Sequence, residues 1–112
     1  MLYTLVRALA LILLVSLAAA RTADSQVPTA VDSARCNEEA PQAAKAGTAS
    51  PITSDRRRAE SARVGTLTPN SVDLTGKFIE SSDPQIHGMN LEGAKDATYQ
   101  AAYRSCMRRK GF

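Results

Sequence analysis

The most regular pattern of apolar positions lies near the end of the 112-residue chain. Four side chains stand there at positions i, i+3, i+4 and i+7 and therefore share one face of a helix: Tyr99, Ala102, Tyr103 and Cys106. This spacing predicts an amphipathic helix over residues 91–110, with the tyrosines and the cysteine on its buried face. The basic run at 108–110 and Gly111 just beyond it suit the end of a helix, where the helix dipole favours positive charge.

A second pattern, of period two, covers the sequence VDLTGKF at residues 72–78. Val72, Leu74 and Phe78 fall on one face and polar side chains on the other, which predicts a half-buried strand. Gly76 marks a bulge in that strand. Turn residues at 69–71 would let it pair with the preceding segment, so we expect a β-hairpin over residues 64–79. The C-terminal helix would have to cover this hairpin, because a lone hairpin is unstable in water.

The helical signals closer to the N-terminus are weaker. Asp32 or Ser33 would cap a short helix that stops before Pro41, since proline disfavours helical geometry at the residue preceding it. We therefore predict a flexible or partly helical segment over residues 21–50. A further helix of about ten residues, with Ser54 as its N-cap and Gly65 after its end, begins a small helical domain over residues 51–112.

The N-terminal end carries a third kind of apolar pattern. Arg7 precedes an uncharged, mainly apolar run over residues 8–20 that ends in small residues. This arrangement is typical of a secretory signal peptide, here residues 1–20, with Ala18 and Ala20 at the small positions of a cleavage site. The alternative is a membrane anchor formed by residues 2–20, which is disfavoured because Arg7 would lie in hydrocarbon. The expected location is secreted or periplasmic.

Removal of residues 1–20 changes what the composition implies. Val, Ile, Leu and Phe account for 12 of the remaining 92 residues, or 13%, which is below the ~20% under which a chain has difficulty burying a core. The net charge is small, since 13 Lys and Arg against 11 Asp and Glu give +2. One small domain of marginal stability fits this composition, and two domains do not.

The two cysteines, Cys36 and Cys106, supply a further restraint. Export brings the chain into an oxidising compartment, where such a pair is expected to form a disulfide. The closed loop of about 70 residues would contribute roughly 4 to 5 kcal/mol in the chain-entropy model. Two buried thiols, or pairing between chains, are the alternatives. The spacing is not that of a C-x-x-C redox motif.

Candidate chemistry is sparse in this sequence. The single histidine, His87, lies between Asp83 and Glu92, but Pro84 and Gly88 place the three on a loop without converging geometry, so we expect a solvated histidine and no metal site. No nucleophile with a tuned base and no paired carboxylates are visible. The sequence thus predicts no catalytic residue and no cofactor, and a protein that is not an enzyme.

Basic side chains gather at residues 56–58 and towards the end of the C-terminal helix. The second group is suited to contact anionic envelope components or an anionic membrane: Arg104, Arg108, Arg109 and Lys110. In that case Tyr99, Tyr103 and Met107 would face the membrane. Nucleic acid is disfavoured as a partner, because the chain is exported and no aromatic residues interleave the arginines. The simpler interpretation is two solvated charged faces.

The last 14 residues fit the pattern Y-x-x-A-Y-x-x-C-M-x-x-K-G. The matching residues are Tyr99, Ala102, Tyr103, Cys106, Met107, Lys110 and Gly111. This segment resembles one found in small secreted or envelope proteins of Gram-negative bacteria. Many of those proteins also carry a glycine zipper, which is absent here, so the resemblance implies a secreted or envelope origin and supplies no catalytic residues.

These patterns predict a small, mainly α protein, in which a C-terminal amphipathic helix packs on a short β-hairpin or loops and the N-terminal part is flexible. The expected function is that of an exported, non-enzymatic binding or structural protein stabilised by one disulfide. The alternative is a peripheral binder of the envelope or of anionic membranes that acts through its basic C-terminal helix.

Overall fold

The computed structural model describes residue 3 and residues 27–66 and 71–112. These residues form four helices and no strand: α2 (Ala30–Ala46), α3 (Thr53–Val64), α4 (Leu91–Ala94) and α5 (Ala97–Arg109). The prediction of a small, mainly helical protein is confirmed. The predicted signal peptide and the alternative anchor lie outside the described residues except at Tyr3. None of the helices searched, all within the described ranges, combines the length and hydropathy needed to cross a bilayer.

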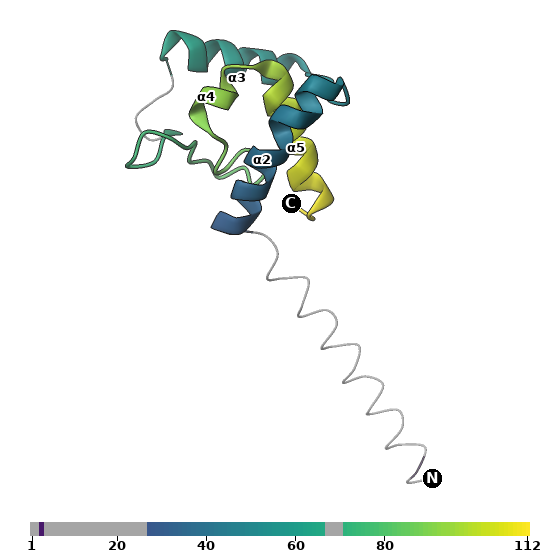
Figure 1. The fold of residues 1–112 in the computed structure, drawn as a ribbon. Coiled ribbons are helices and arrows are strands. Elements are labelled where there is room, and N and C mark those ends of the chain that lie inside the picture. The colour runs from purple at the N-terminus through teal and green to yellow at the C-terminus, as the bar shows by residue number, and fades with distance from the viewer. Residues whose placement is uncertain (1–2, 4–26, 67–70) are drawn as a thin grey trace.

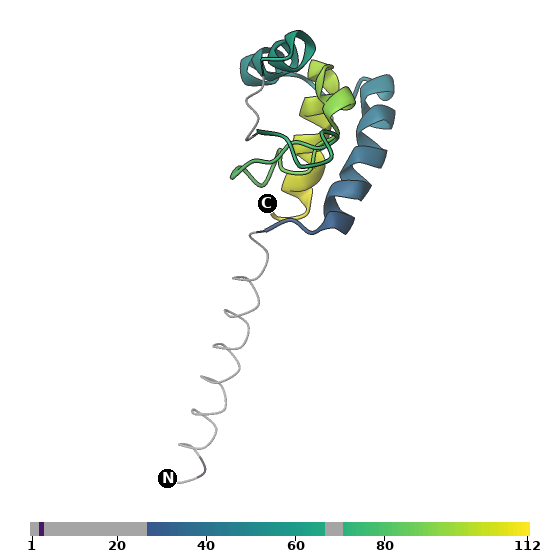
Figure 2. The same cartoon turned by 90° about the vertical axis from the view of Figure 1, so that its left-hand side faces the viewer.

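Helices α2 and α5 lie side by side and form the most extensive contact between helices (Figures 1 and 2). The predicted disulfide between Cys36 and Cys106 joins them directly, across a sequence separation of 70. Helix α3 packs on α4 and α5. The loop of residues 71–90 returns to this framework, where backbone oxygens of His87 and Gly88 accept hydrogen bonds from Tyr103 of α5 and Asn37 of α2.

The core consists mainly of aromatic, sulfur-containing and alanine side chains. Its largest fully buried apolar members are Tyr103, Met89, Met107 and the two disulfide cysteines. The stripe predicted for the C-terminal helix is buried throughout, which confirms its orientation. Tyr99 and Met107 are 7% and 0% exposed, so a membrane-facing position for this stripe is wrong. Tyrosine and methionine bury much apolar area each, which compensates for the scarcity of branched aliphatic residues.

Helix α2 is longer than predicted. It is capped by Thr29, whose hydroxyl oxygen accepts from the Asp32 backbone N–H while the Asp32 carboxylate accepts from the Thr29 N–H, a reciprocal capping box. The expected cap at Asp32 or Ser33 is therefore wrong by three or four positions. The helix ends at Ala46, and Gly47 forms its C-cap in a left-handed conformation with φ of 69°.

The predicted stop at Pro41 is also wrong, because α2 continues through the proline. A proline inside a helix has no N–H for the carbonyl four residues earlier, here that of Asn37. In this structure the Tyr99 hydroxyl donates to that carbonyl at 3.3 Å and to the Asn37 side-chain oxygen at 2.7 Å. A side chain of α5 thus supplies a shared hydrogen bond to the carbonyl that Pro41 leaves without an N–H donor.

The single C-terminal helix predicted over 91–110 is two helices, α4 and α5, divided at residues 95–96. The Asn90 side chain caps the first by accepting from the Gly93 N–H, and the Asp96 side chain caps the second by accepting from the Thr98 N–H. Gly93 lies against the Tyr99 ring, and a Cβ at Gly93 would stand only 2.3 Å from a ring carbon. The chain bends here so that α4 can fold onto the aromatic face of α5.

The predicted β-hairpin over 64–79 is not seen among the described residues. Residues 73–78 form a turn, and Val72 and Ile79 are joined by a single antiparallel bridge. The Asp73 carboxylate accepts from the Thr75 hydroxyl at 2.8 Å and from the Lys77 N–H at 3.1 Å. These local bonds hold the turn, and they leave Leu74 fully exposed at its tip, where the alternating pattern had placed it inside.

Candidate functional site

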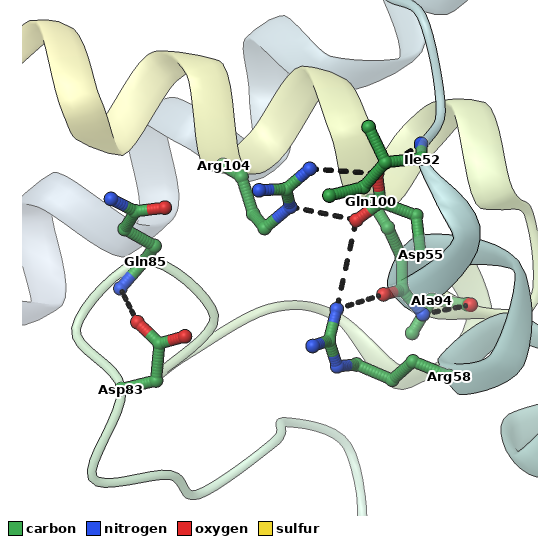
Figure 3. Close-up of polar contacts among 8 residues, drawn as sticks. All are labelled: Ile52, Asp55, Arg58, Asp83, Gln85, Ala94, Gln100 and Arg104. Atoms are coloured by element: carbon green, nitrogen blue, oxygen red, sulfur yellow. Dashed lines mark hydrogen bonds and ion pairs between the residues drawn. The ribbon is translucent and has the colours of Figure 1, made fainter.

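Of the four side chains predicted to contact anions, Arg104 is the most deeply placed. Its Nε and Nη2 atoms each lie 2.7 Å from an oxygen of Asp55, which is fully buried on α3 (Figure 3). One of these carboxylate oxygens also accepts from the Ile52 N–H at 2.9 Å, which caps the start of α3. A paired, two-pronged contact of this kind fixes α3 on α5. It also leaves Arg104 committed to an internal partner.

Two more side chains extend this buried polar cluster, as Figure 3 shows. Arg58 Nη1 donates to Gln100 Oε1 at 2.8 Å and lies 3.7 Å from Asp55 Oδ1. The Gln100 amide nitrogen donates to the Ala94 carbonyl at 2.7 Å. Every buried side-chain nitrogen and oxygen in the described part of the chain has a partner. The cluster is therefore a fully bonded structural joint.

Two of the other three predicted anion contacts lie near acidic residues of α2. Arg109 forms an ion pair with Glu39, and Lys110 Nζ lies 3.6 Å from Asp32 Oδ1. Arg108 is exposed and forms no ion pair within the described ranges. Three of the four positive charges on the C-terminal helix are thus balanced by carboxylates of this same chain.

The His87 side chain is held by a backbone contact. Its Nδ1 accepts from the Ser81 N–H at 3.2 Å, so that nitrogen carries no proton in this arrangement. The side chains considered above as possible metal ligands do not converge; they are Asp83, His87 and Glu92. Over the described residues no group of three His, Cys, Asp or Glu side chains is placed to hold a metal ion.

A groove of about 530 Å³ opens between the start of α2 and the loop of residues 73–88, and we name it the α2 groove. Its size falls within the range of roughly 300 to 1,000 Å³ that small-ligand sites occupy. Phe78 lies in its wall and is 38% exposed, so part of its apolar ring faces the groove. The complete lining is Pro28, Thr29, Ala30, Ser33, Ala34, Asn37, Asp73, Phe78, Ile79, Glu80, His87 and Gly88.

One face of α2 forms the floor of this groove. The lining residues Ala30, Ser33, Ala34 and Asn37 stand at i, i+3, i+4 and i+7, so short side chains leave the space open. Gly88 approaches this face so closely that a Cβ there would lie 2.2 Å from the Ser33 hydroxyl oxygen. The Asn37 amide nitrogen donates to the Gly88 carbonyl at 2.9 Å, which fixes the loop to the helix at the groove's inner end.

Two carboxylates lie at the groove, and they differ in whether their oxygens are free to bond a ligand. Hydrogen bonds from the Thr75 side chain, followed by those from backbone N–H groups of the turn, hold the pKa of Asp73 below its usual value of 3.8. Asp73 is thus charged at neutral pH, but its oxygens are occupied within the turn. Glu80 is exposed and its carboxylate has no partner among the described residues.

Sequence reasoning did not identify the α2 groove. Its walls come from two segments that are about forty residues apart and are brought together by Asn37 and Ser33, neither of which marks a site by its type. The one signal of this groove in the sequence was Phe78, which the alternating pattern placed on the buried face of a predicted strand. Comparisons with protein-family models, with curated proteins and with solved structures found no match to this chain.

Proposed function

We propose that this chain is an exported, non-enzymatic binding protein, in which the α2–α5 pair is the framework and the α2 groove is the binding site. The observation that carries the proposal is the partly exposed Phe78 ring in the wall of a groove of about 530 Å³, in a protein whose core is held by a disulfide. Exposed apolar surface in a concave site is the usual mark of a binding surface.

Export is the second part of the proposal, and the disulfide supports it. A disulfide between Cys36 and Cys106 is compatible with an oxidising compartment outside the cytoplasm, where such bonds form and persist. Residues 1–20 supply the expected signal peptide. Intact mass spectrometry of the exported fraction, with and without reduction and alkylation, should find a chain that starts at Arg21 and whose cysteines are blocked until reduced. A full-length mass with free thiols would contradict export.

The binding part is tested by a fragment screen on the ¹⁵N-labelled, oxidised protein recovered from that fraction. Small amphipathic fragments should give saturable shifts of the Ala30, Ala34 and Ile79 amides. Phe78→Ser should remove these shifts, because the ring supplies the apolar wall. Leu74→Ser is the matched control, since Leu74 is more exposed and belongs to the same turn but does not line the groove.

Equal effects of the two substitutions, or saturable shifts only elsewhere on the protein, would contradict a binding site in the groove. The alternative function, contact with an anionic envelope surface, would now rest mainly on Arg108 of the predicted set, because the other three cations are paired. Salt-sensitive sedimentation with anionic vesicles that Arg108→Ala abolishes would favour that alternative.

A further inference from the structure

The charges at the α2 groove are opposite in sign to those of the chain as a whole. The exported chain of the proposed function, residues 21–112, has 13 Lys and Arg against 11 Asp and Glu, a net charge of +2. The groove is lined by two carboxylates, Asp73 and Glu80, and by no lysine or arginine. The nearby cations on the same elements, Arg35 and Lys77, are exposed and are not among the lining residues.

The apolar and acidic parts of the groove lie close together in sequence and space. Phe78 and Glu80 belong to one short extended segment, which is held on both sides: the Glu80 N–H donates to the Ser71 carbonyl at 2.9 Å, and the Ile79 N–H donates to the Met89 carbonyl at 2.9 Å. Neither bond involves the Phe78 or Glu80 side chain. The aromatic ring and the free carboxylate are thus presented from a fixed backbone.

From this arrangement, and resting on the proposed function of the groove, we propose that its ligand is a peptide segment in which an apolar side chain stands next to a lysine or arginine. The apolar side chain packs between Phe78 and the alanines of α2, and the cation contacts the Glu80 carboxylate. Asp73 adds negative potential but no direct bond, because its oxygens are occupied by the turn.

The positive net charge of the protein allows a sharp test of a cationic ligand. A positively charged protein attracts an anionic peptide at long range, so selection of a cationic peptide has to come from the groove itself. The probes are three N-acetylated and C-amidated peptides: KLKLKL, its charge-inverted counterpart ELELEL, and KGKGKG, which keeps the cations without the apolar side chains. Each is titrated into the oxidised, ¹⁵N-labelled protein.

We expect KLKLKL to give saturable shifts at Ala30, Ala34 and Ile79, and the other two peptides to bind at least roughly tenfold more weakly, a difference of about 1.4 kcal/mol. Glu80→Lys should weaken KLKLKL binding roughly three- to tenfold, as reversal of a rim charge does. The matched control is Glu38→Lys, which makes the same charge change at an exposed position of α2 outside the groove and should leave binding unchanged.

Two results would overturn the inference. One is ELELEL binding in the groove as tightly as KLKLKL, and the other is an equal effect of the substitutions at Glu80 and Glu38. If fragments still bind the groove in either case, the proposed function stands and only the cationic ligand is rejected. If neither fragments nor peptides perturb the groove, the proposed function fails together with it.

Discussion

Asp55 is the residue whose environment differs most from what its side chain prefers. It is fully buried on α3, and its charge is balanced by Arg104 through two bonds of 2.7 Å. A buried pair of this kind contributes little net stability compared with an apolar pair, because both charges lose their hydration. Its value lies in specificity, since α3 has only alanines to bury, Ala59 and Ala62, and the ion pair sets the position of the helix on α5.

Removal of one partner of the Asp55–Arg104 ion pair should lower the stability of the protein. We expect Asp55→Ala to lower the free energy of unfolding by roughly 3 to 5 kcal/mol, because the mostly buried Arg104 guanidinium loses its carboxylate partner. The control is Glu60→Ala on the same helix, which breaks an exposed ion pair with Arg63 and should cost less than about 1 kcal/mol. Urea unfolding followed by circular dichroism measures both variants, and equal midpoints would show that the buried pair has no special role.

At the scale of the elements, the junction between α2 and α5 includes a hydrogen bond from the Tyr99 hydroxyl. This group bonds the carbonyl of Asn37 that Pro41 leaves without an N–H donor. Tyr99→Phe should therefore destabilise the protein by roughly 1 to 2 kcal/mol, the lower part of the range of about 1 to 3 kcal/mol for a buried acceptor left without a donor, because this site is partly buried. In a Pro41→Ala background the helix supplies its own N–H to that carbonyl, so the cost of Tyr99→Phe should shrink. A double-mutant cycle in urea measures this coupling, and strict additivity would contradict it.

The two tyrosines of α5 also predict an alkaline limit to stability. Burial raises the pKa of both Tyr99 and Tyr103 to about 12, from the ordinary value of 10. The neutral form is the one favoured in the folded state, so stability is fully present below pH 10 and is lost as pH rises through about 12. Each tyrosine should cost up to roughly 2 to 3 kcal/mol over that window.

Urea unfolding at a series of pH values tests this expectation. The free energy of unfolding should fall above pH 10, and tyrosinate absorbance should appear together with the loss of helical signal. The Tyr99→Phe/Tyr103→Phe variant should have a flatter profile in the same window. Ionisation of both tyrosines while the helices remain intact would contradict their burial.

How much of these elements could be predicted depends on whether the decisive contacts are local. The stripe on α5 was predictable because its spacing repeats within one helix. The passage of α2 through Pro41 was not, because the compensating hydroxyl comes from Tyr99, far along the chain. The alternating pattern at residues 72–78 led to the wrong prediction of a strand. Hydrogen bonds accepted by the Asp73 side chain stabilise a turn there instead. The α2 groove could not be predicted because its two walls come from segments that are distant in the sequence.

For the whole molecule, the disulfide is the main restraint on the unfolded chain. Replacement of both cysteines, Cys36→Ala/Cys106→Ala, should lower stability by roughly 4 to 5 kcal/mol, because a loop with a sequence separation of 70 is no longer closed. A small domain has a margin of about 5 kcal/mol, so much of the variant should be unfolded at room temperature. Thermal melting of the variant, of the reduced protein and of the oxidised protein tests this; identical melting curves would show that the crosslink adds nothing.

The same separation has a consequence for the time course of folding. The helices that share the largest contact, α2 and α5, are far apart in sequence, so the order of assembly cannot follow the order of the chain. A reduced chain has to search for this encounter across a long loop, which slows folding of proteins dominated by distant contacts. An oxidised chain starts with the two helices already tethered. Formation of the disulfide therefore divides folding into a slow search and a rapid assembly that follows it. The chain is most exposed to proteases during the slow search, before the disulfide has formed.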